Sequence, residues 1–153
     1  MIIVCKPGAT LITFEDIPNA NSVHGTIPAT YKGVNWPNGN YLNATAYPST
    51  GYQFVRVSGE YVAWFNYVLT IQTLVANSTF ILNSCVMAAG WADVQLTIVG
   101  YYSTTQLYTT AISLNTHSQN VLILDWPGVN TVVFTPYSSG YPDTGIDNLC
   151  ITF

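Results

Sequence analysis

Charged residues are scarce in this sequence, and their scarcity excludes several classes of protein. Only 7% of the 153 residues are charged, against about 25% in an ordinary soluble protein. The basic residues are Lys6, Lys32 and Arg56, too few and too dispersed to neutralise the phosphates of a nucleic acid. The same shortage excludes a polybasic patch for an anionic membrane surface. We therefore expect no nucleic acid among the partners.

Long apolar runs are missing as well. A membrane-spanning helix needs about 18 or more consecutive apolar residues, and the nearest candidate, residues 61–80, is interrupted by Asn66, Gln72 and Asn77. Residues 1–5 are too short for the apolar part of a signal peptide and lack its basic flank. We expect no membrane insertion, and if the protein is secreted, its signal is absent from this chain.

What the sequence does contain is apolar and aromatic. Hydrophobic residues make up 49% of the chain and aromatic residues 14%, with a net charge of −4. This composition argues against disorder, and a chain of this length can bury roughly 68–70% of its unfolded surface. We expect one domain with a sizeable core.

The apolar residues recur with the period of β-strands. Residues 94–99 alternate at their start between apolar and polar side chains, and the strand-like runs are rich in β-branched and aromatic residues. Turn signals containing Pro, Gly and Asn separate them, and no segment has the apolar spacing of an amphipathic helix. Many short strands separated by turns predict an antiparallel sandwich or barrel. The runs are residues 10–14, 94–99, 107–114, 121–124, 129–134 and 146–153.

Acidic residues stand near both ends of the chain. If the first and last strands are antiparallel neighbours, Asp16 lies close to Asp147. Carboxylates brought together in a charge-poor protein need a cation or a shared proton, and hard oxygen ligands suit calcium. The alternative is that Asp16 begins a turn and that Asp147 and Asn148 bond the backbone.

Five segments together resemble secreted jelly-roll modules similar to carbohydrate-binding modules, a family of extracellular domains from microbes and fungi. The resemblance covers nearly the whole chain, although its individual motifs are short. The segments are TFEDIP (13–18), IPATYKGVNWPNGNYLN (27–43), SGEYVAWF (58–65), FILNSCVMAAGWADVQLTIVGY (80–101) and IDNLCITF (146–153).

The resemblance implies an all-β, antiparallel jelly-roll-like β-sandwich. We assign residues 9–153 to this single domain and residues 1–8 to an apolar N-terminal arm. Many such modules hold a structural calcium ion between an acidic stretch of the first strand and an aspartate of the last strand. Carried over to this chain, the calcium ligands are Glu15, Asp16 and Asp147.

The chain has three cysteines, Cys5, Cys85 and Cys150, and an odd number suggests an intermolecular bond or a free thiol. Pairing Asp16 with Asp147 places Thr10 near the end of the last strand, so that residues 1–7 protrude beyond it. An apolar strand of this kind can pair with a neighbouring copy, locked by Cys5. Two alternatives stay open: the arm folds back with Cys5 bonded to Cys85 or Cys150, or all three cysteines are reduced.

Two sequons, at Asn43 and Asn77, fit a secreted glycoprotein, whose N-linked glycans would keep a charge-poor surface soluble. Catalytic signals are weak by comparison. The candidate acids of a glycosidase, Asp93 and Asp125, each stand beside a tryptophan, a pattern more typical of core packing than of catalysis. We therefore expect an extracellular protein that is not an enzyme.

Residues 19–52 are predicted to form long loops and short strands over one face. This segment holds the aromatic side chains that we expect to contact a glycan or a protein partner, Trp36, Tyr41, Tyr47 and Tyr52, whereas Trp64 and Trp91 look like core residues. Our first functional hypothesis is a structural protein that self-assembles into a glycosylated filament or coat through the N-terminal arm and Cys5. The alternative is a carbohydrate-binding module that uses the loop aromatics.

Overall fold

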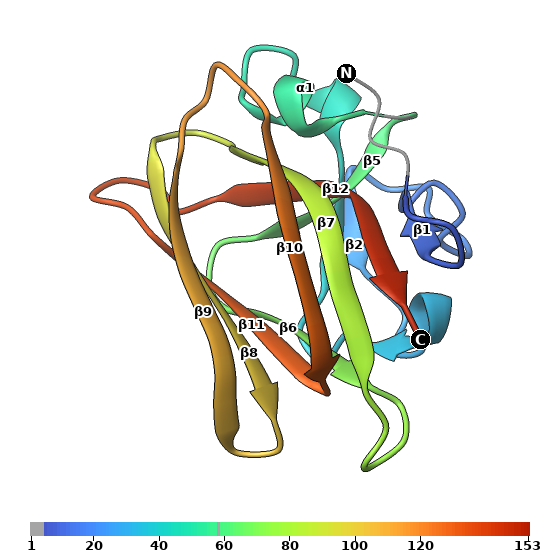
Figure 1. Cartoon of the computed structure of the whole chain (residues 1–153). Coiled ribbons are helices and arrows are strands. Elements are labelled where there is room, and N and C mark those ends of the chain that lie inside the picture. The colour runs from blue at the N-terminus through green and yellow to red at the C-terminus, as the bar shows by residue number, and fades with distance from the viewer. Residues whose placement is uncertain (1–4, 58) are drawn as a thin grey trace.

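The computed structural model describes residues 5–57 and 59–153 (Figure 1). Nearly all regular structure in these residues is β-strand, with one short helix, α1 (Tyr52–Val55), and two short 3-10 turns (Tyr31–Gly33 and Ala44–Ala46). The strands are β1 (Thr10–Ile12), β2 (His24–Thr26), β3 (Val34–Asn35), β4 (Asn40–Asn43), β5 (Tyr61–Phe65), β6 (Leu69–Thr73), β7 (Phe80–Ala89), β8 (Val94–Tyr102), β9 (Thr105–Leu114), β10 (Asn120–Val129), β11 (Thr131–Tyr137) and β12 (Thr144–Thr152).

The strands form two antiparallel sheets packed face to face. One sheet has the order β10-β7-β12-β5-β4-β2, with β1 also paired to β12, and the other has the order β3-β6-β11-β8-β9. The eight strands from β5 to β12 thus form two facing sets of four, in the orders β5-β12-β7-β10 and β6-β11-β8-β9. Two interleaved Greek keys of this kind define a jelly roll, so the predicted fold class is confirmed.

Alternation of side chains accounts for the core. On β8, Val94, Leu96 and Ile98 are buried while the residues between them are more exposed, as expected for a strand with one face on the core. Strand β12 is buried on both faces. A second cluster, which includes Tyr52, Val86 and Ala88, packs α1 and its flanking loop against β5 and β7. The segment 19–52, predicted to form long loops and short strands over one face, supplies β2 and β4 to one sheet and β3 to the other.

The first and last strands are antiparallel neighbours, the condition on which the pairing of Asp16 with Asp147 was based, but in another register. Thr10 lies opposite Ile151 and Ile12 lies opposite Leu149, whereas the predicted register placed Thr10 near Phe153. The shift of two residues leaves every side chain on its expected face, because the side-chain period of a strand is also two.

The chain preceding β1 turns back instead of running on. The Ala9 amide donates a hydrogen bond to the Lys6 carbonyl at 3.0 Å, and Gly8 has a φ of +87°, which glycine adopts without strain. The turn brings Cys5 to Cys150, and the two form a disulfide. Cys85 is free and buried.

The disulfide corrects the hypothesis that Cys5 joins neighbouring subunits, because its sulfur is already bonded within the chain. The open alternative, Cys5 paired with Cys150, describes the structure. The proposed strand donation falls mainly on residues 1–4, which lie outside the described residues.

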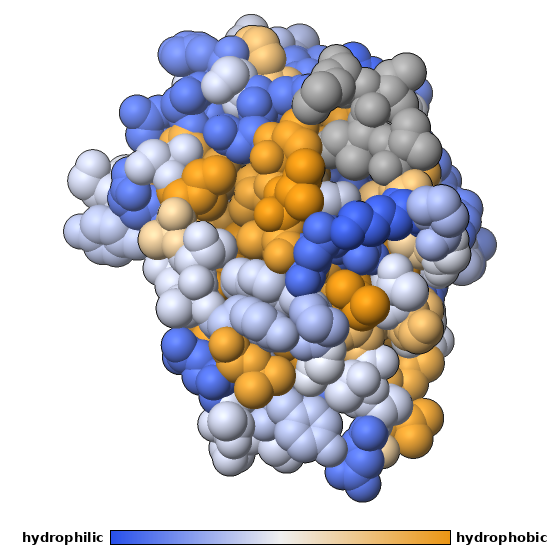
Figure 2. Space-filling model, viewed as in Figure 1, coloured by the Kyte–Doolittle hydropathy of each residue, from blue (hydrophilic) through white to orange (hydrophobic). Residues whose placement is uncertain are grey.

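None of the described helices has the length and apolar character needed to cross a bilayer. The face viewed in Figure 2 carries apolar residues over the upper parts of β7 and β10, with hydrophilic residues around them. Ile123 of β10 is 72% exposed.

Candidate functional site

Several loops that are distant in sequence meet at one end of the sandwich, toward the upper left of Figure 1. They follow β5 (residues 66–68), β7 (90–93), β9 (115–119) and β11 (138–143), and the segment 47–54 lies beside them. We call this end the Trp91 end. The β6–β7 loop and the C-terminus lie at the opposite end (Figure 1).

The first hollow at the Trp91 end has a volume of about 430 Å³ and is lined by Asn66, Trp91, Tyr141 and Asp143. We call it the Tyr141 hollow. Its two aromatic side chains are open to solvent, since Tyr141 is 72% exposed and Trp91 is 52% exposed. Large aromatic side chains on a concave surface beside a few polar groups are typical of a ligand site.

The carboxylate at this hollow is held in a defined position. Asp143 is 7% exposed, and its Oδ1 accepts a hydrogen bond from Trp64 Nε1 at 2.9 Å. Burial, together with the neighbouring charge of Asp143, raises the pKa of the Tyr52 hydroxyl, which therefore stays protonated. A carboxylate accepts several hydrogen bonds, so Asp143 can accept from a ligand hydroxyl while Trp64 fixes its orientation.

The Trp91 indole is supported from behind by another aromatic side chain. The rings of Tyr47 and Trp91 meet edge to face, with centroids 5.8 Å apart and planes at 84°. Such a pair contributes about 0.5–1.5 kcal/mol beyond its buried area. The chain also approaches closely at Gly90, where a Cβ atom would lie 2.7 Å from the Tyr52 hydroxyl oxygen. A larger residue at position 90, next to Trp91, would therefore clash with the Tyr52 ring.

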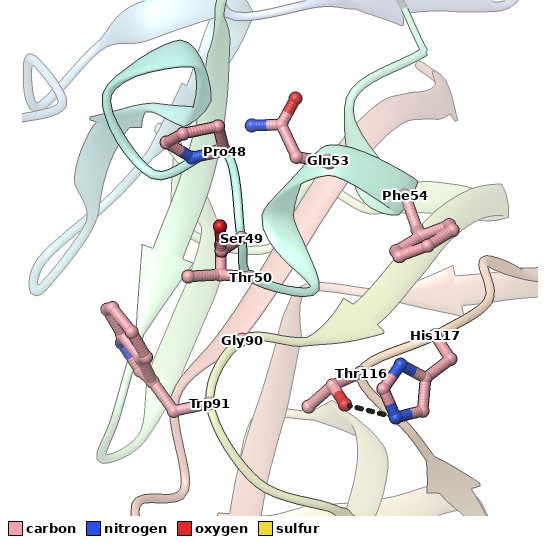
Figure 3. Close-up of a pocket in the computed structure, with 9 residues that line it drawn as sticks. All are labelled: Pro48, Ser49, Thr50, Gln53, Phe54, Gly90, Trp91, Thr116 and His117. Atoms are coloured by element: carbon pink, nitrogen blue, oxygen red, sulfur yellow. Dashed lines mark hydrogen bonds between the residues drawn. The ribbon is translucent and has the colours of Figure 1, made fainter.

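A second hollow, of about 330 Å³, is also lined by Trp91, and we call it the Phe54 hollow. Figure 3 shows Trp91 on one side, Phe54 and His117 on the other, and Gly90 between them. Its lining residues are Pro48, Ser49, Thr50, Gln53, Phe54, Gly90, Trp91, Thr116 and His117.

The polar side chains of the Phe54 hollow are held by local bonds. Thr50 Oγ1 donates to the Tyr47 carbonyl at 2.8 Å and accepts from the Tyr52 amide at 3.3 Å. Thr116 Oγ1 and His117 Nε2 lie 3.3 Å apart (Figure 3). The His117 amide donates to Asn115 Oδ1 at 2.8 Å, which fixes the loop. The hollow thus combines two aromatic walls with hydroxyl, amide and imidazole groups.

The aromatic residues predicted to contact a partner are mostly buried, which corrects that prediction. The exposed fractions of Trp36, Tyr41 and Tyr52 are 2%, 6% and 1%. Trp36 is a core residue because Phe14 packs edge-on against its ring at 5.8 Å, while its Nε1 donates to the Tyr31 carbonyl at 2.8 Å. Among the four, Tyr47 lies at the site, where it supports Trp91.

Trp91, in contrast, was expected in the core and is half exposed. Its neighbours in the sequence are apolar, but it stands on the turn after β7, where strand alternation no longer applies. The signal that could have found it is Gly90-Trp91-Ala92-Asp93, a short break between two strongly predicted strands.

The three carboxylates predicted to bind calcium each have partners within the protein. Glu15 Oε1 accepts from the amides of Glu60, at 2.9 Å, and Tyr61, at 2.7 Å. Asp16 accepts from the Tyr31 hydroxyl at 2.6 Å and pairs with Lys32.

Asp147 is buried where β12 bulges against β7. Its Oδ2 accepts from the Val57 amide at 2.8 Å and its Oδ1 from the Asn148 amide at 2.7 Å, which is the backbone bonding left open above. Across residues 5–57 and 59–153, no group of three or more His, Cys, Asp or Glu side chains is placed to hold a metal ion. The structure therefore does not bring the three carboxylates together, and calcium binding stays a prediction.

The two sequon asparagines differ in their surroundings. Asn43 Oδ1 accepts from the Thr45 amide at 3.0 Å, and its Nδ2 donates to Glu60 Oε2 at 3.3 Å. Asn77 is exposed on the β6–β7 loop with a φ of +67°. Glycosylation stays a prediction at both positions, and Asn77 is the more accessible of the two.

Of the two candidate glycosidase acids, Asp125 forms an ion pair with Lys6. Lys6 Nζ lies 2.6 Å from its Oδ2, and the hydrogen bond from Lys6 holds the pKa of Asp125 below its usual range. A general acid needs the opposite shift. Asp93 is an exposed residue of the β7–β8 turn.

Comparison with known proteins adds little to this geometry. No family model and no curated protein matches the chain. A solved structure of TmCBM61, a carbohydrate-binding module, in complex with beta-1,4-galactotriose matches with a TM-score of 0.41 and 11% sequence identity. The match covers 81% of this chain and 93% of that one. This similarity is too distant to carry a ligand or a function from that protein to this chain.

Proposed function

We propose that this protein binds neutral glycans, without catalysis, at the Trp91 end. The observation that carries the proposal is the Tyr141 hollow, where two exposed aromatic side chains, Trp91 and Tyr141, stand beside the carboxylate of Asp143 and the amide of Asn66. Aromatic rings stack on the apolar C–H faces of pyranoses, while carboxylates and amides bond their hydroxyl groups. The alternative hypothesis drawn from the sequence is thus retained, with a different set of aromatic residues.

Charge favours a neutral sugar over an acidic one. None of the three basic residues lines either hollow. Lys6 pairs with Asp125 and Lys32 with Asp16, and Arg56 donates to the Gly59 carbonyl at 3.0 Å. A uronate or sulfate group would meet the buried charge of Asp143 with no cation to offset it.

The same proposal places the protein outside the cell. A structural disulfide persists in oxidising compartments and is rare in the cytosol, and Cys5 and Cys150 form one here. We rank the self-assembling filament below glycan binding, because the disulfide occupies the cysteine that was to join the subunits.

The test is binding by the purified protein to an array of neutral and acidic glycans, followed by calorimetric titration with the best neutral oligosaccharide. We expect Trp91→Ala and Tyr141→Ala each to weaken binding by about tenfold or more, because truncating an aromatic anchor removes most of its contact energy.

Tyr137→Ala is the matched control, since Tyr137 lies on β11 and is 70% exposed but lines neither hollow. Its affinity should equal that of the wild type. Equal affinities for all three variants, or an array without any neutral glycan bound, would contradict the proposal.

A further inference from the structure

We propose that the Tyr141 and Phe54 hollows are adjacent subsites for one glycan chain that passes over Trp91. This inference rests on the proposed function and deepens it, because it assigns the site to the interior of an oligosaccharide and not to a single terminal sugar. The geometry points to it through one residue: Trp91 lines both hollows.

The Phe54 hollow offers the same chemistry as the Tyr141 hollow. Phe54 is 42% exposed, and it stands across the hollow from Trp91 (Figure 3), so that a sugar ring between them meets an aromatic side chain on each side. His117 and Ser49 are exposed at the same hollow and can bond sugar hydroxyls. A patch of exposed apolar residues alone would lack these polar groups.

Backbone hydrogen bonds tie the walls of the two hollows together. The Gly51 amide donates to the Gly90 carbonyl at 2.9 Å, and the Gly90 amide donates to the Asp143 carbonyl at 2.8 Å. Gly51 belongs to the segment beside the Phe54 hollow, Asp143 lines the Tyr141 hollow, and Gly90 precedes Trp91. The subsites are therefore fixed relative to each other, which lowers the entropic cost of binding a chain across both.

Glycine is required where these segments cross. A Cβ atom on Gly51 would lie 1.7 Å from the Ala89 carbonyl oxygen, closer than any real contact. The Ala89 amide, in turn, donates to the Asn115 carbonyl at 3.2 Å, which ties the loop carrying Thr116 and His117 to the end of β7. These close contacts and hydrogen bonds hold together three segments that are far apart in the sequence, residues 47–54, 90–93 and 115–119.

The test compares chain lengths in calorimetric titrations of the full chain. The probes are glucose, cellobiose and cellohexaose, with the matching manno- and galacto-oligosaccharides. We expect the hexasaccharide of the binding series to bind about tenfold or more tightly than its disaccharide. Phe54→Ala should remove most of that gain and weaken the disaccharide much less than the hexasaccharide, whereas Tyr141→Ala should weaken both.

Phe153→Ala is the matched control, because Phe153 is 62% exposed and lines a hollow at the opposite end of the sandwich. His117→Ala provides a second variant of the Phe54 hollow outside α1, and it should act as Phe54→Ala does. Circular dichroism of each variant establishes that it is folded.

The outcomes separate the two proposals. If both chain lengths bind alike, or if Phe54→Ala and His117→Ala bind the hexasaccharide like the wild type while Tyr141→Ala does not, the second subsite is refuted and glycan binding stands. If a longer glycan chain binds more tightly by the same factor in the wild type, Phe54→Ala and His117→Ala, the gain comes from the many positions at which a long chain can occupy one subsite. The inference is then refuted as well. If none of the probes binds, the inference fails, and the glycan array decides separately on the proposed function.

Discussion

Two regions of this molecule carry tryptophan and tyrosine, and the fold treats them in opposite ways. In the segment of residues 27–52, Trp36 is 2% exposed, whereas in the loops of the Trp91 end, Trp91 is 52% exposed. The sequence around Trp36 is polar and that around Trp91 is apolar, the reverse of what their exposure suggests. In a loop, therefore, the polarity of sequence neighbours does not indicate whether a side chain faces solvent.

The difference arises from what covers each ring. Trp36 lies under an N-terminal layer in which Phe14 and Tyr31 pack against it, and Tyr31 is itself bonded to Asp16. Trp91 has Tyr47 at its edge and stands on a turn where β7 ends. The aromatic side chains around Trp36 therefore stabilise the core, whereas those of the Trp91 end are exposed and can contact a ligand.

The largest expected effect in this comparison is on stability. Trp36→Ala should lower the free energy of unfolding by about 3–5 kcal/mol, because it leaves a cavity in a close-packed core. Trp91→Ala should lower it by only about 1–2 kcal/mol, since Trp91 is already 52% exposed and loses mainly its edge-to-face contact with Tyr47. Urea unfolding followed by circular dichroism measures both, and equal losses for the two variants would erase the distinction between the regions.

A second prediction concerns the disulfide between Cys5 and Cys150, which ties the chain preceding β1 to the last strand, β12. The double variant Cys5→Ser, Cys150→Ser should lose about 2–5 kcal/mol of its free energy of unfolding, because the bond closes a loop across a sequence separation of 145 residues. Its glycan affinity should not change, since neither residue lines a hollow at the Trp91 end.

Thiol titration and electrophoresis test the pairing directly. Burial raises the pKa of the Cys85 thiol to about 12, so the native protein should show no reactive thiol and the denatured protein one. A disulfide-linked dimer on a non-reducing gel, or three reactive thiols after denaturation, would show that Cys5 is not paired as described.

The smallest effect is on pH dependence. Burial raises the pKa of Asp16, but the hydrogen bonds from Lys32 and Tyr31 outweigh it and hold the pKa below its usual range. A lowered folded pKa stabilises the protein above the unfolded value of about 3.9 and ceases to do so as the pH falls through the folded pKa. Because the Asp16 side chain is 57% exposed, we expect its lowered pKa to contribute less than about 1 kcal/mol to the free energy of unfolding.

The melting temperature of Asp16→Asn should therefore lie slightly below that of the wild type at neutral pH and converge with it in acid. Asp93→Asn, at an exposed position of the β7–β8 turn, should follow the wild type throughout. A difference between wild type and Asp16→Asn that grows in acid would reverse the expected sign.

Strand alternation and turn residues were enough to predict an antiparallel sandwich or barrel. The jelly roll was implied by the resemblance to carbohydrate-binding modules, and the pairing of β1 with β12 was an assumption that the structure bears out. The path of residues 5–9 was not predictable in the same way, because a single turn at Gly8 decides whether the chain protrudes or folds back onto Cys150. The candidate site was missed for a related reason. Asn66, Trp91 and Tyr141 come from three separate loops, and only the order of strands in the two sheets brings those loops to one end.

The most direct test of the account follows the indole N–H signals of the four tryptophans by NMR during titration with the neutral oligosaccharide that binds best. The signals are assigned with single Trp→Phe variants. We predict that the Trp91 signal shifts in a saturable manner while the Trp36 signal stays in place. A saturable shift at Trp36 with none at Trp91 would contradict it.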